Sequence, residues 1–336
     1  MVGRPPGGPP TVRLLVTGPS GMLGSYLVPE LLNDGHQVTA LVHRTPLKQD
    51  GIAVVQGDVT LPWFGMKSPL PQVDAIVHCA GAVSFRDRPD LHLNNVVGVE
   101  YASMLSVDLH VPLFHISTAY VCGDAKGVCD PNYFHESLKF RNAYEKSKFQ
   151  AECIIRGKPG VEYMIIRPSI LVGDSKIVGI PPMSGLYVAL RACYLGKRWL
   201  ERKAGLPPIE PHIRLPGDPE ATLNMIPVDI AARQIADLVK ANARGAYYVT
   251  NETPPLVKDI ATAASRALGA RIEMVPDFAP NPAERLVLRL MRDVAPYMAG
   301  EPVFDNSATW PFTSARCYGL SLDFIEATTR VFLGER

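Results

Sequence analysis

A glycine-rich turn between an apolar strand and a helix constrains the fold of this chain more than any other feature. Residues 12–16 form a nearly continuous apolar run, as expected of a strand buried on both faces of a parallel sheet. The turn from Thr17 to Gly24 (T-G-P-S-G-M-L-G) follows, and apolar residues at helical spacing continue to Leu31. Glycines allow a sharp turn and a close approach of backbone N–H groups to a phosphate. We therefore expect this turn to bind the pyrophosphate of a dinucleotide; a turn that only joins strand to helix is the alternative.

Strand and helix patterns alternate along the first half of the chain. Strands are expected at residues 37–42, 53–56, 73–78, 113–117 and 162–166, and helices at 91–107 and 142–155. This alternation predicts an α/β fold of the Rossmann type, with a doubly wound parallel sheet. A helix at 228–243 and a strand at 246–250 indicate that the chain returns to this sheet, and a possible strand follows at 271–275.

The domain organisation is expected to be one nucleotide domain with a smaller substrate lobe. At 336 residues the chain exceeds the size at which single cores stop growing, roughly 250 to 300 residues. Residues 1–10 are rich in Gly and Pro and predict a flexible leader. We place a dinucleotide-binding domain at residues 11–175, continued by 224–252, and a substrate-binding lobe at 176–223 and 253–336.

The composition excludes several classes of function. The 34 basic and 33 acidic side chains give a formal net charge of +1, so no basic surface for nucleic acid is indicated. The longest mostly apolar segment, residues 181–195, contains Arg191 and is shorter than the roughly 20 residues that a membrane span needs. Neither the eight His nor the six Cys suggest a metal site. Without C-x-x-C spacing or a secretory segment, a cytoplasmic protein with reduced thiols is expected.

The residues after the second strand favour a phosphorylated dinucleotide. Proteins that bind NAD usually carry an acidic residue there for the ribose 2′-hydroxyl, whereas this chain has Val42, His43 and Arg44. An arginine at this place can hold a 2′-phosphate. NADPH is therefore the expected cofactor, with a surface arginine of no ligand role as the alternative.

A tyrosine and a lysine one helical turn apart provide the candidate catalytic groups. Tyr144 and Lys148 share one helix face, and Thr118 lies at the carboxyl end of an earlier strand, the edge where doubly wound sheets bind ligands. A free phenol has a pKa of about 10, so Lys148 and the positive ring of the oxidised cofactor would be needed to lower it. This arrangement is typical of hydride transfer with proton transfer by the tyrosine.

These motifs together resemble the extended short-chain dehydrogenases/reductases. The matching segments are residues 17–24, 57–60, 78–81, 95–98, 117–121, 144–148, 167–169 and 226–229. The resemblance implies that Thr118, Tyr144 and Lys148 form the catalytic triad and that Asn95 supports the active site. Threonine replaces the commoner serine and keeps the hydroxyl.

The glycine turn and the resemblance together indicate where the ligands bind. Around the cofactor we expect Gly18, Ser20, Gly21, Met22, Leu23, Gly24, His43, Arg44, Asp58, Val59, Ala80, Gly81, Ala82, Tyr144, Lys148, Pro168 and Ser169. Substrate specificity is expected in residues 82–86, 119–122 and 169–217, with Ser84, Phe85, Ala119, Tyr120, Met183 and Tyr187 as candidates. The apolar members of that set could instead pack the lobe onto the main domain.

Finer features resemble the thioester-reductase and fatty-acyl-reductase branch. They are residues 57–66 (G-D-V-T-L-P-W-F-G-M), 117–121, 167–175 and 304–307 (F-D-N-S). That resemblance implies reduction of carrier-bound or CoA thioesters by NADPH. The chain has no room for an adenylation or carrier domain, so its substrate would come from an acyl carrier protein or CoA, or would be a free ketone.

Other activities remain open at this point. A hydroxysteroid-dehydrogenase-like or flavonoid-reductase-like enzyme is the main competitor, and a nucleotide-sugar epimerase or dehydratase is less favoured because Val42 is not acidic. A dinucleotide-sensing protein without catalysis is disfavoured by the intact Tyr144–Lys148 pair. The oligomeric state is not predicted by any feature of the sequence.

Overall fold

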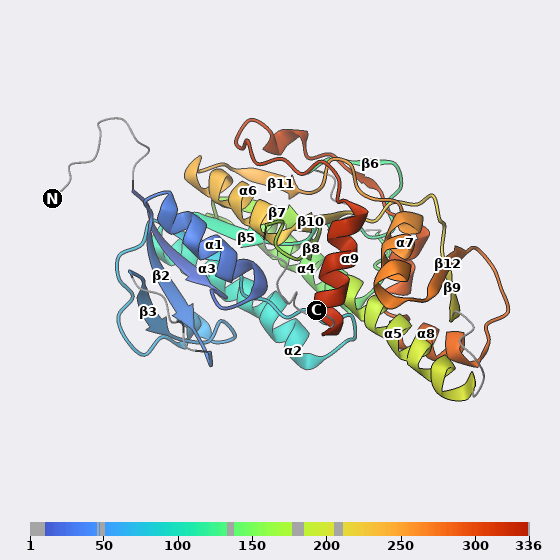
Figure 1. Cartoon of the computed structure of the whole chain (residues 1–336). Helices are drawn as coiled ribbons and strands as arrows, with labels where there is room; N and C mark the ends of the chain where they lie inside the picture. The colour runs from blue at the N-terminus through green and yellow to red at the C-terminus, as the bar shows by residue number, and fades with distance from the viewer. Residues whose placement is uncertain are drawn as a thin grey trace.

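The computed structural model describes residues 11–45, 47, 51–132, 138–176, 185–204 and 211–334. Its centre is a seven-stranded, all-parallel sheet of strand order β3-β2-β1-β4-β5-β7-β11 (Figure 1). The strands are β1 (Arg13–Thr17), β2 (Gln37–Val42), β3 (Ala53–Gln56), β4 (Ala75–His78), β5 (Leu113–Ile116), β7 (Tyr163–Pro168) and β11 (Gly245–Val249). The expected doubly wound Rossmann fold is confirmed, and the strand order reverses between β1 and β4.

Helices cover both faces of the sheet. On one face α1 (Met22–Asn33) and α6 (Val228–Lys240) lie side by side and bury their apolar residues against the strands (Figure 1). On the other face α3 (Gly98–Leu109) and α4 (Ala143–Gly157) pack against the opposite set of strand residues. The two apolar clusters explain why the strands read as continuous apolar runs, since alternate residues face alternate helix layers.

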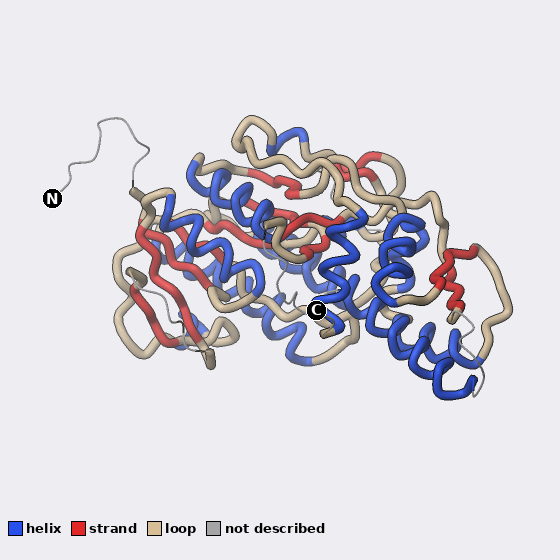
Figure 2. Tube along the Cα trace, viewed as in Figure 1, coloured by secondary structure: helices blue, strands red, loops and turns tan. Residues whose placement is uncertain are grey.

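The second half of the chain adds a mainly helical lobe beside the carboxyl edge of the sheet (Figure 2). Its helices are α5 (Gly185–Ala204), α7 (Val257–Leu268), α8 (Pro282–Met291) and α9 (Leu322–Leu333). Three short parallel strand pairs accompany them: β8 (Ile170–Val172) with β10 (Met225–Pro227), β9 (His212–Pro216) with β12 (Arg271–Val275), and β6 (Val128–Cys129) with β13 (Val303–Phe304). A third apolar cluster joins α5, α7, α8 and α9 into one body.

Short helical turns complete the described elements. They are η1 (Pro62–Gly65), α2 (Pro89–His92), the π-helical turn η2 (Leu93–Val97), η3 (Ala119–Cys122), η4 (Ala295–Ala299) and η5 (Ser307–Thr309). The helix expected at residues 91–107 is therefore divided into α2, η2 and α3. Within the described ranges, no helix combines the length and apolarity needed to cross a membrane.

The sequence predicted some elements to the residue and others only approximately. β2, β3 and β12 have the expected bounds, and the strand expected at 246–250 joins β7 in the main sheet as β11. The short pairs β8–β10 and β6–β13 were not expected, because strands of two or three residues have no periodicity to detect. The predicted leader, residues 1–10, lies outside the described part of the chain.

Candidate active site

One cavity of about 250 Å³ lies at the carboxyl ends of the central strands, where the strand order reverses. This is the position at which doubly wound sheets bind ligands. One side of the cavity comes from the nucleotide half: Gly21, Met22, Leu23, Gly24, Cys79, Gly81, Ala82, Val83, Ile116, Ser117, Thr118, Tyr144, Lys148 and Pro168 to Leu171. The other side is mostly apolar and comes from Phe85, Tyr120, Gly185, Leu186, Leu223, Val294, Tyr297 and Met298.

The glycine turn has the geometry of a phosphate cradle. Gly18 has a φ of +66°, and a Cβ there would lie 2.7 Å from the backbone nitrogen of Ala80. A Cβ at Gly24 would overlap the carbonyl oxygen of Gly18, so neither position accepts a side chain. Helix α1 begins with Gly21 at its N-cap, without a capping side chain and without an acidic residue in its first turn. Its first N–H groups and positive dipole end therefore suit a pyrophosphate.

A second feature suits a nicotinamide cofactor. The hydroxyl of Ser169 is buried, lines the cavity and has no hydrogen-bond partner in the described part of the protein. A buried hydroxyl of this kind is normally satisfied, so an unpaired one on a residue that lines the cavity suits a polar ligand group. The cradle and Ser169 lie at two sites along the same cavity, and both fit a dinucleotide.

The expected adenosine-binding residues lie beyond this cavity, after β2 and β3. The Nε2 of His43 is 3.4 Å from a carboxylate oxygen of Asp58, and Arg44 is exposed. Burial raises the pKa of Asp58, but hydrogen bonds from Thr60 and the charges of His43 and Arg44 lower it by more. The pKa of Asp58 therefore lies below its usual value. Val59 is buried against the start of α3. Gly18 and Ser20 belong to the glycine turn and Ala80 lies against Gly18, but none of the three lines the cavity.

The three predicted catalytic residues converge on the cavity. Lys148 is buried and donates a hydrogen bond from Nζ to the carbonyl oxygen of Ile116 at 2.9 Å. Thr118 caps η3, and its Oγ1 lies 3.4 Å from the backbone nitrogen of Tyr120. Tyr144 lies one turn before Lys148 in α4, so both side chains face the end of β5. A carbonyl group in the cavity could contact both hydroxyls.

Burial shifts the pKa values of both Tyr144 and Lys148. It raises the pKa of the Tyr144 phenol well above its ordinary value, and negative charge at Cys79 and Glu145 adds to the effect. Burial lowers the pKa of Lys148 to about 8, against the opposing influence of Cys79 and Glu152. The expected lowering of the phenol pKa is thus not found in the protein alone. Desolvation of the phenolate is the largest cause of the shift, and the Lys148 ammonium donates its hydrogen bond to a backbone carbonyl.

Asn95 acts from outside the cavity. It lies in the π-helical turn η2, fully buried, and its Oδ1 accepts a hydrogen bond from the Ala82 nitrogen at 2.7 Å. Its Nδ2 donates to the Ala82 carbonyl and to the Oγ of Ser147, each at 2.9 Å. Ser147 in turn donates to the carbonyl oxygen of Tyr144 at 2.8 Å. Asn95 therefore ties the loop after β4 to the catalytic helix.

A buried ion pair below the cavity was missed by the sequence analysis. Glu152 accepts hydrogen bonds from the Nη2 of Arg167 at 2.7 Å and from the Oγ of Ser117 at 2.7 Å, and neither charged side chain is exposed. The pair joins α4 to the ends of β5 and β7. A signal was present, because Glu152 follows Tyr144 and Lys148 at the same four-residue spacing and so lies on the same helix face.

The structure brings only part of the predicted substrate set to the cavity. Phe85 and Tyr120 line it, whereas Ala119 is fully buried and Ser84 donates to the carbonyl of Arg86. Tyr187 does not reach the cavity; it is fully buried with its ring 4.9 Å from that of Phe332. Its neighbour Leu186 lines the cavity, since successive helix residues point about 100° apart. Met183 lies outside the described residues.

Four residues on the lobe side of the cavity were not expected from the sequence. They are Leu223, Val294, Tyr297 and Met298. Three of them belong to the short segment that follows α8 and forms η4, where proline and the absence of a long helix leave no periodic pattern. Only the tertiary arrangement places them opposite the catalytic helix.

Comparison with known proteins agrees with this geometry. The sequence model of the family described as male sterility protein, an NAD-binding family, matches residues 44–235. The range includes Thr118, Tyr144 and Lys148 but begins after the glycine turn. A curated relative, the 4-hydroxy-2-methyl-3-oxo-4-farnesyl-3,4-dihydroquinoline-1-oxide ketoreductase of Stigmatella aurantiaca, is 27% identical over 184 residues, 51% of this chain and 54% of that protein. The chain spans about half the length of the first curated relatives it matches.

Two solved structures share the fold over nearly the whole chain. The terminal R domain from the myxalamid PKS-NRPS biosynthetic pathway has a TM-score of 0.72 and 19% identity, covering 98% of this chain and 92% of the other. A thiolation-reductase di-domain from an archaeal non-ribosomal peptide synthetase has a TM-score of 0.68 and 14% identity, covering 97% and 91%. At these identities the likeness establishes the fold.

Proposed function

This chain belongs to the male sterility protein family within the extended short-chain dehydrogenases/reductases, and we propose that it is an NADPH-dependent reductase of a bulky, largely apolar carbonyl compound. The observation that carries the proposal is the convergence of Thr118, Tyr144 and Lys148 on one cavity beside the glycine cradle. In this proposal residues 11–175 and 224–252 bind the cofactor, and residues 176–223 and 253–336 form the substrate lobe.

The protein's own residues provide the acid catalysis. Thr118 and Tyr144 would donate hydrogen bonds to the carbonyl oxygen, and Tyr144 would transfer its proton to that oxygen as negative charge develops there. When bound, the reduced nicotinamide supplies a hydride to the carbonyl carbon. The Tyr144 phenol, whose pKa burial raises, is protonated at neutral pH, which is the state that a proton donor needs in the direction of reduction. Lys148 would hold the nicotinamide ribose and keep the phenol in place.

The preference for NADPH rests on charge at the end of β2. No carboxylate follows Val42, and His43 and Arg44 present two potential cations to a 2′-phosphate. Asp58 lies 3.4 Å from His43 and partly offsets this attraction. Both side chains are exposed, and Arg44 is the better candidate of the two because its guanidinium is always charged and can bind a phosphate through two N–H groups.

The apolar character of the substrate is inferred from the lobe side of the cavity. Phe85, Leu186 and Met298 offer hydrocarbon, and the two phenols on this wall already donate their protons to carboxylates. A polar substrate tail would lose its hydrogen bonds to water there without replacement. A hydrocarbon tail would gain roughly 25 cal/mol for each Å² removed from water.

Two carbonyl classes fit this cavity. The similarity to a ketoreductase supports a free ketone, and the family and the shared fold with reductase domains of synthetases support an acyl thioester. A thioester would come from CoA or an acyl carrier protein; hydride and proton addition would give a hemithioacetal, which releases the thiol and leaves an aldehyde. A hydroxysteroid-dehydrogenase-like activity falls within the ketone class.

The test is NADPH oxidation with a panel of acyl-pantetheine thioesters, long-chain aldehydes and polycyclic ketones, with products identified by mass spectrometry. We expect turnover with at least one apolar class and loss of turnover in Tyr144→Phe. NADPH binding without oxidation by any member would contradict the proposed reductase. Product from ketones alone would eliminate the thioester.

A further inference from the structure

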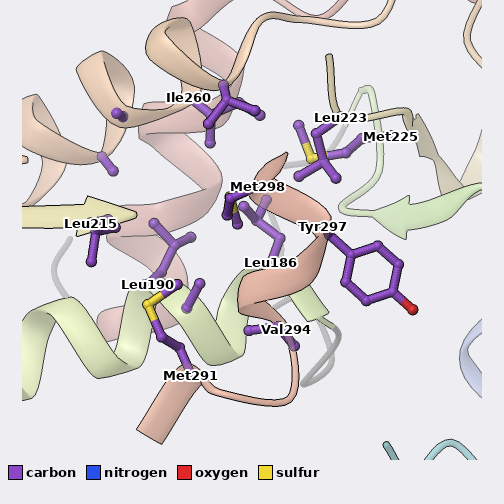
Figure 3. Packing of buried hydrophobic residues seen from close by; sticks show 14 of the residues in the cluster. Leu186, Leu190, Leu215, Leu223, Met225, Ile260, Met291, Val294, Tyr297 and Met298 are labelled. Atoms are coloured by element: carbon purple, nitrogen blue, oxygen red, sulfur yellow. The ribbon is translucent and has the colours of Figure 1, made fainter. Parts of the chain in front are cut away.

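Tyr297 connects the substrate lobe to the catalytic helix. Tyr297 lines the lobe side of the cavity, and Figure 3 shows how its side chain lies relative to other residues of the lobe. In that view the ring projects away from Leu186, Val294 and Met298, with the oxygen at its far end. The side chain thus has an apolar face toward the substrate region and a polar end directed at another element.

That element is the first turn of α4, which carries Tyr144. The Tyr297 hydroxyl donates to Oε1 of Glu145 at 2.6 Å and accepts from Nδ2 of Asn142 at 2.8 Å. Asn142 is the N-cap of α4, with its Oδ1 accepting from the Glu145 nitrogen at 3.0 Å. One phenol therefore contacts the capping residue and the residue next to the proposed proton donor.

The contact between Tyr297 and Glu145 is important because the Glu145 carboxylate is fully buried. Its remaining partners come from one residue: the backbone nitrogen of Arg141 at 2.9 Å and a guanidinium nitrogen at 3.5 Å. A buried charge needs such donors, and loss of one leaves an uncompensated lone pair beside Tyr144. The short distance to the Tyr297 hydroxyl marks a strong, charge-assisted hydrogen bond.

A second phenol on the same wall is directed elsewhere. The Tyr120 ring packs edge-on against the Tyr297 ring at a centroid distance of 5.0 Å, and its hydroxyl donates to Glu301 at 2.7 Å. The guanidinium of Arg141 lies over both rings, at 5.9 and 5.3 Å. Tyr120 thus supports the Tyr297 ring without contacting the first turn of α4 through its hydroxyl.

We propose that Tyr297 is a positioning residue through which an apolar substrate orients Tyr144. A hydrocarbon tail that packs on the Tyr297 ring holds its hydroxyl on Asn142 and Glu145, which fixes the first turn of α4 and the phenol that it carries. This inference rests on the proposed function, since it assumes that the lobe side of the cavity holds the apolar part of the substrate. A short substrate that leaves the ring uncovered would not have this effect.

The test compares dodecanal with propanal as substrates for the wild type and Tyr297→Phe, which keeps the ring and removes the hydroxyl. We expect the variant to lose about tenfold in kcat for dodecanal, the effect of one hydrogen bond to a charged group, while its KM changes less than about twofold. Its kcat for propanal should change far less. Tyr247→Phe, which removes a hydroxyl bonded to the Arg244 carbonyl at 2.8 Å, is the matched control.

An equal loss of kcat for both aldehydes would indicate a purely structural role and overturn the proposal, as would an unchanged kcat for dodecanal. If the wild type reduces neither aldehyde, the proposed function fails and a second measurement decides the inference. Hydrogen exchange of residues 141–148 should slow when dodecanol binds to the wild type, and should not slow in Tyr297→Phe. Equal protection in both proteins, or no binding of dodecanol to the wild type, would also overturn it.

Discussion

Removing the charge of Glu152 should destabilise the whole protein, because the partner left behind cannot reach water. Glu152 and Arg167 are both fully buried, with two hydrogen bonds between them at 2.7 and 3.0 Å. In Glu152→Gln the amide oxygen can accept only one of these two hydrogen bonds, and the guanidinium keeps the Pro131 carbonyl at 3.0 Å and the Tyr248 hydroxyl at 3.3 Å but loses the carboxylate charge. Breaking one side of such a pair typically costs about 3 to 5 kcal/mol, and we expect a loss of unfolding free energy in that range.

The assay is urea unfolding followed by tryptophan fluorescence and circular dichroism, which should report coincident transitions. Glu220→Gln is the control, because its ion pair with Lys258 is exposed and should contribute less than about 1 kcal/mol. The double variant Glu152→Gln with Arg167→Met should recover part of the loss, since the buried cation is then removed. A Glu152→Gln variant as stable as Glu220→Gln would refute this reasoning.

The same pair has a defined dependence on pH. Burial raises the pKa of Glu152, but the charge of Arg167 and its hydrogen bonds lower it by more, so the pKa lies below its ordinary value of 4.5. A carboxyl group with a lowered folded pKa contributes stability above its unfolded pKa, and this is lost as the pH falls through the folded value. The difference in unfolding free energy between wild type and Glu152→Gln should therefore be constant at neutral pH and shrink below about pH 4.5.

Three further predictions concern the active site. Tyr144→Phe should lower kcat by about 10² or more while NADPH affinity, measured by fluorescence titration, barely changes, since it removes only the proton donor. NADPH should bind at least about tenfold more tightly than NADH, and in Arg44→Ala the two affinities should become nearly equal. Equal affinities in the wild type would contradict the assignment of NADPH as the cofactor. Burial lowers the pKa of Lys148 from 10.5 to about 8, so between these values the unfolded chain binds a proton that the folded one does not. Stability should therefore rise with pH across that window in the wild type relative to Lys148→Met, as measured by urea unfolding.

The features that the sequence predicted well are those encoded locally. The inner strands of the central sheet are buried on both faces, so β1, β4 and β7 read as nearly continuous apolar runs. Gly18 and Gly24 could be assigned to a cradle because only glycine fits at these positions. Gly18 needs a positive φ, and Gly24 has no space for a Cβ. Tyr144 and Lys148 could be paired because their spacing is one helical turn.

The features that it missed depend on contacts between distant segments. Tyr297 meets Glu145 across 152 positions of sequence, and no local pattern marks either residue. Tyr187 was expected at the cavity because α5 has apolar residues on more than one face, and periodicity does not say which face meets the substrate. The division of the helix at residues 91–107 arises from the π-helical turn that aims Asn95 at Ala82, a tertiary contact.

Helix α4 is held by contacts from both the nucleotide half and the lobe. Glu152 joins it to the strand ends, and Ser147 joins it to Asn95 and the loop after β4. Both partners belong to the nucleotide half, whereas the first turn is held by Tyr297 from the single-turn element η4 in the lobe. A displacement of the lobe would therefore act on Tyr144 while Lys148, one turn further along, stays bonded to the Ile116 carbonyl. In the proposed mechanism, this order of contacts would allow the substrate to influence Tyr144 without disturbing Lys148.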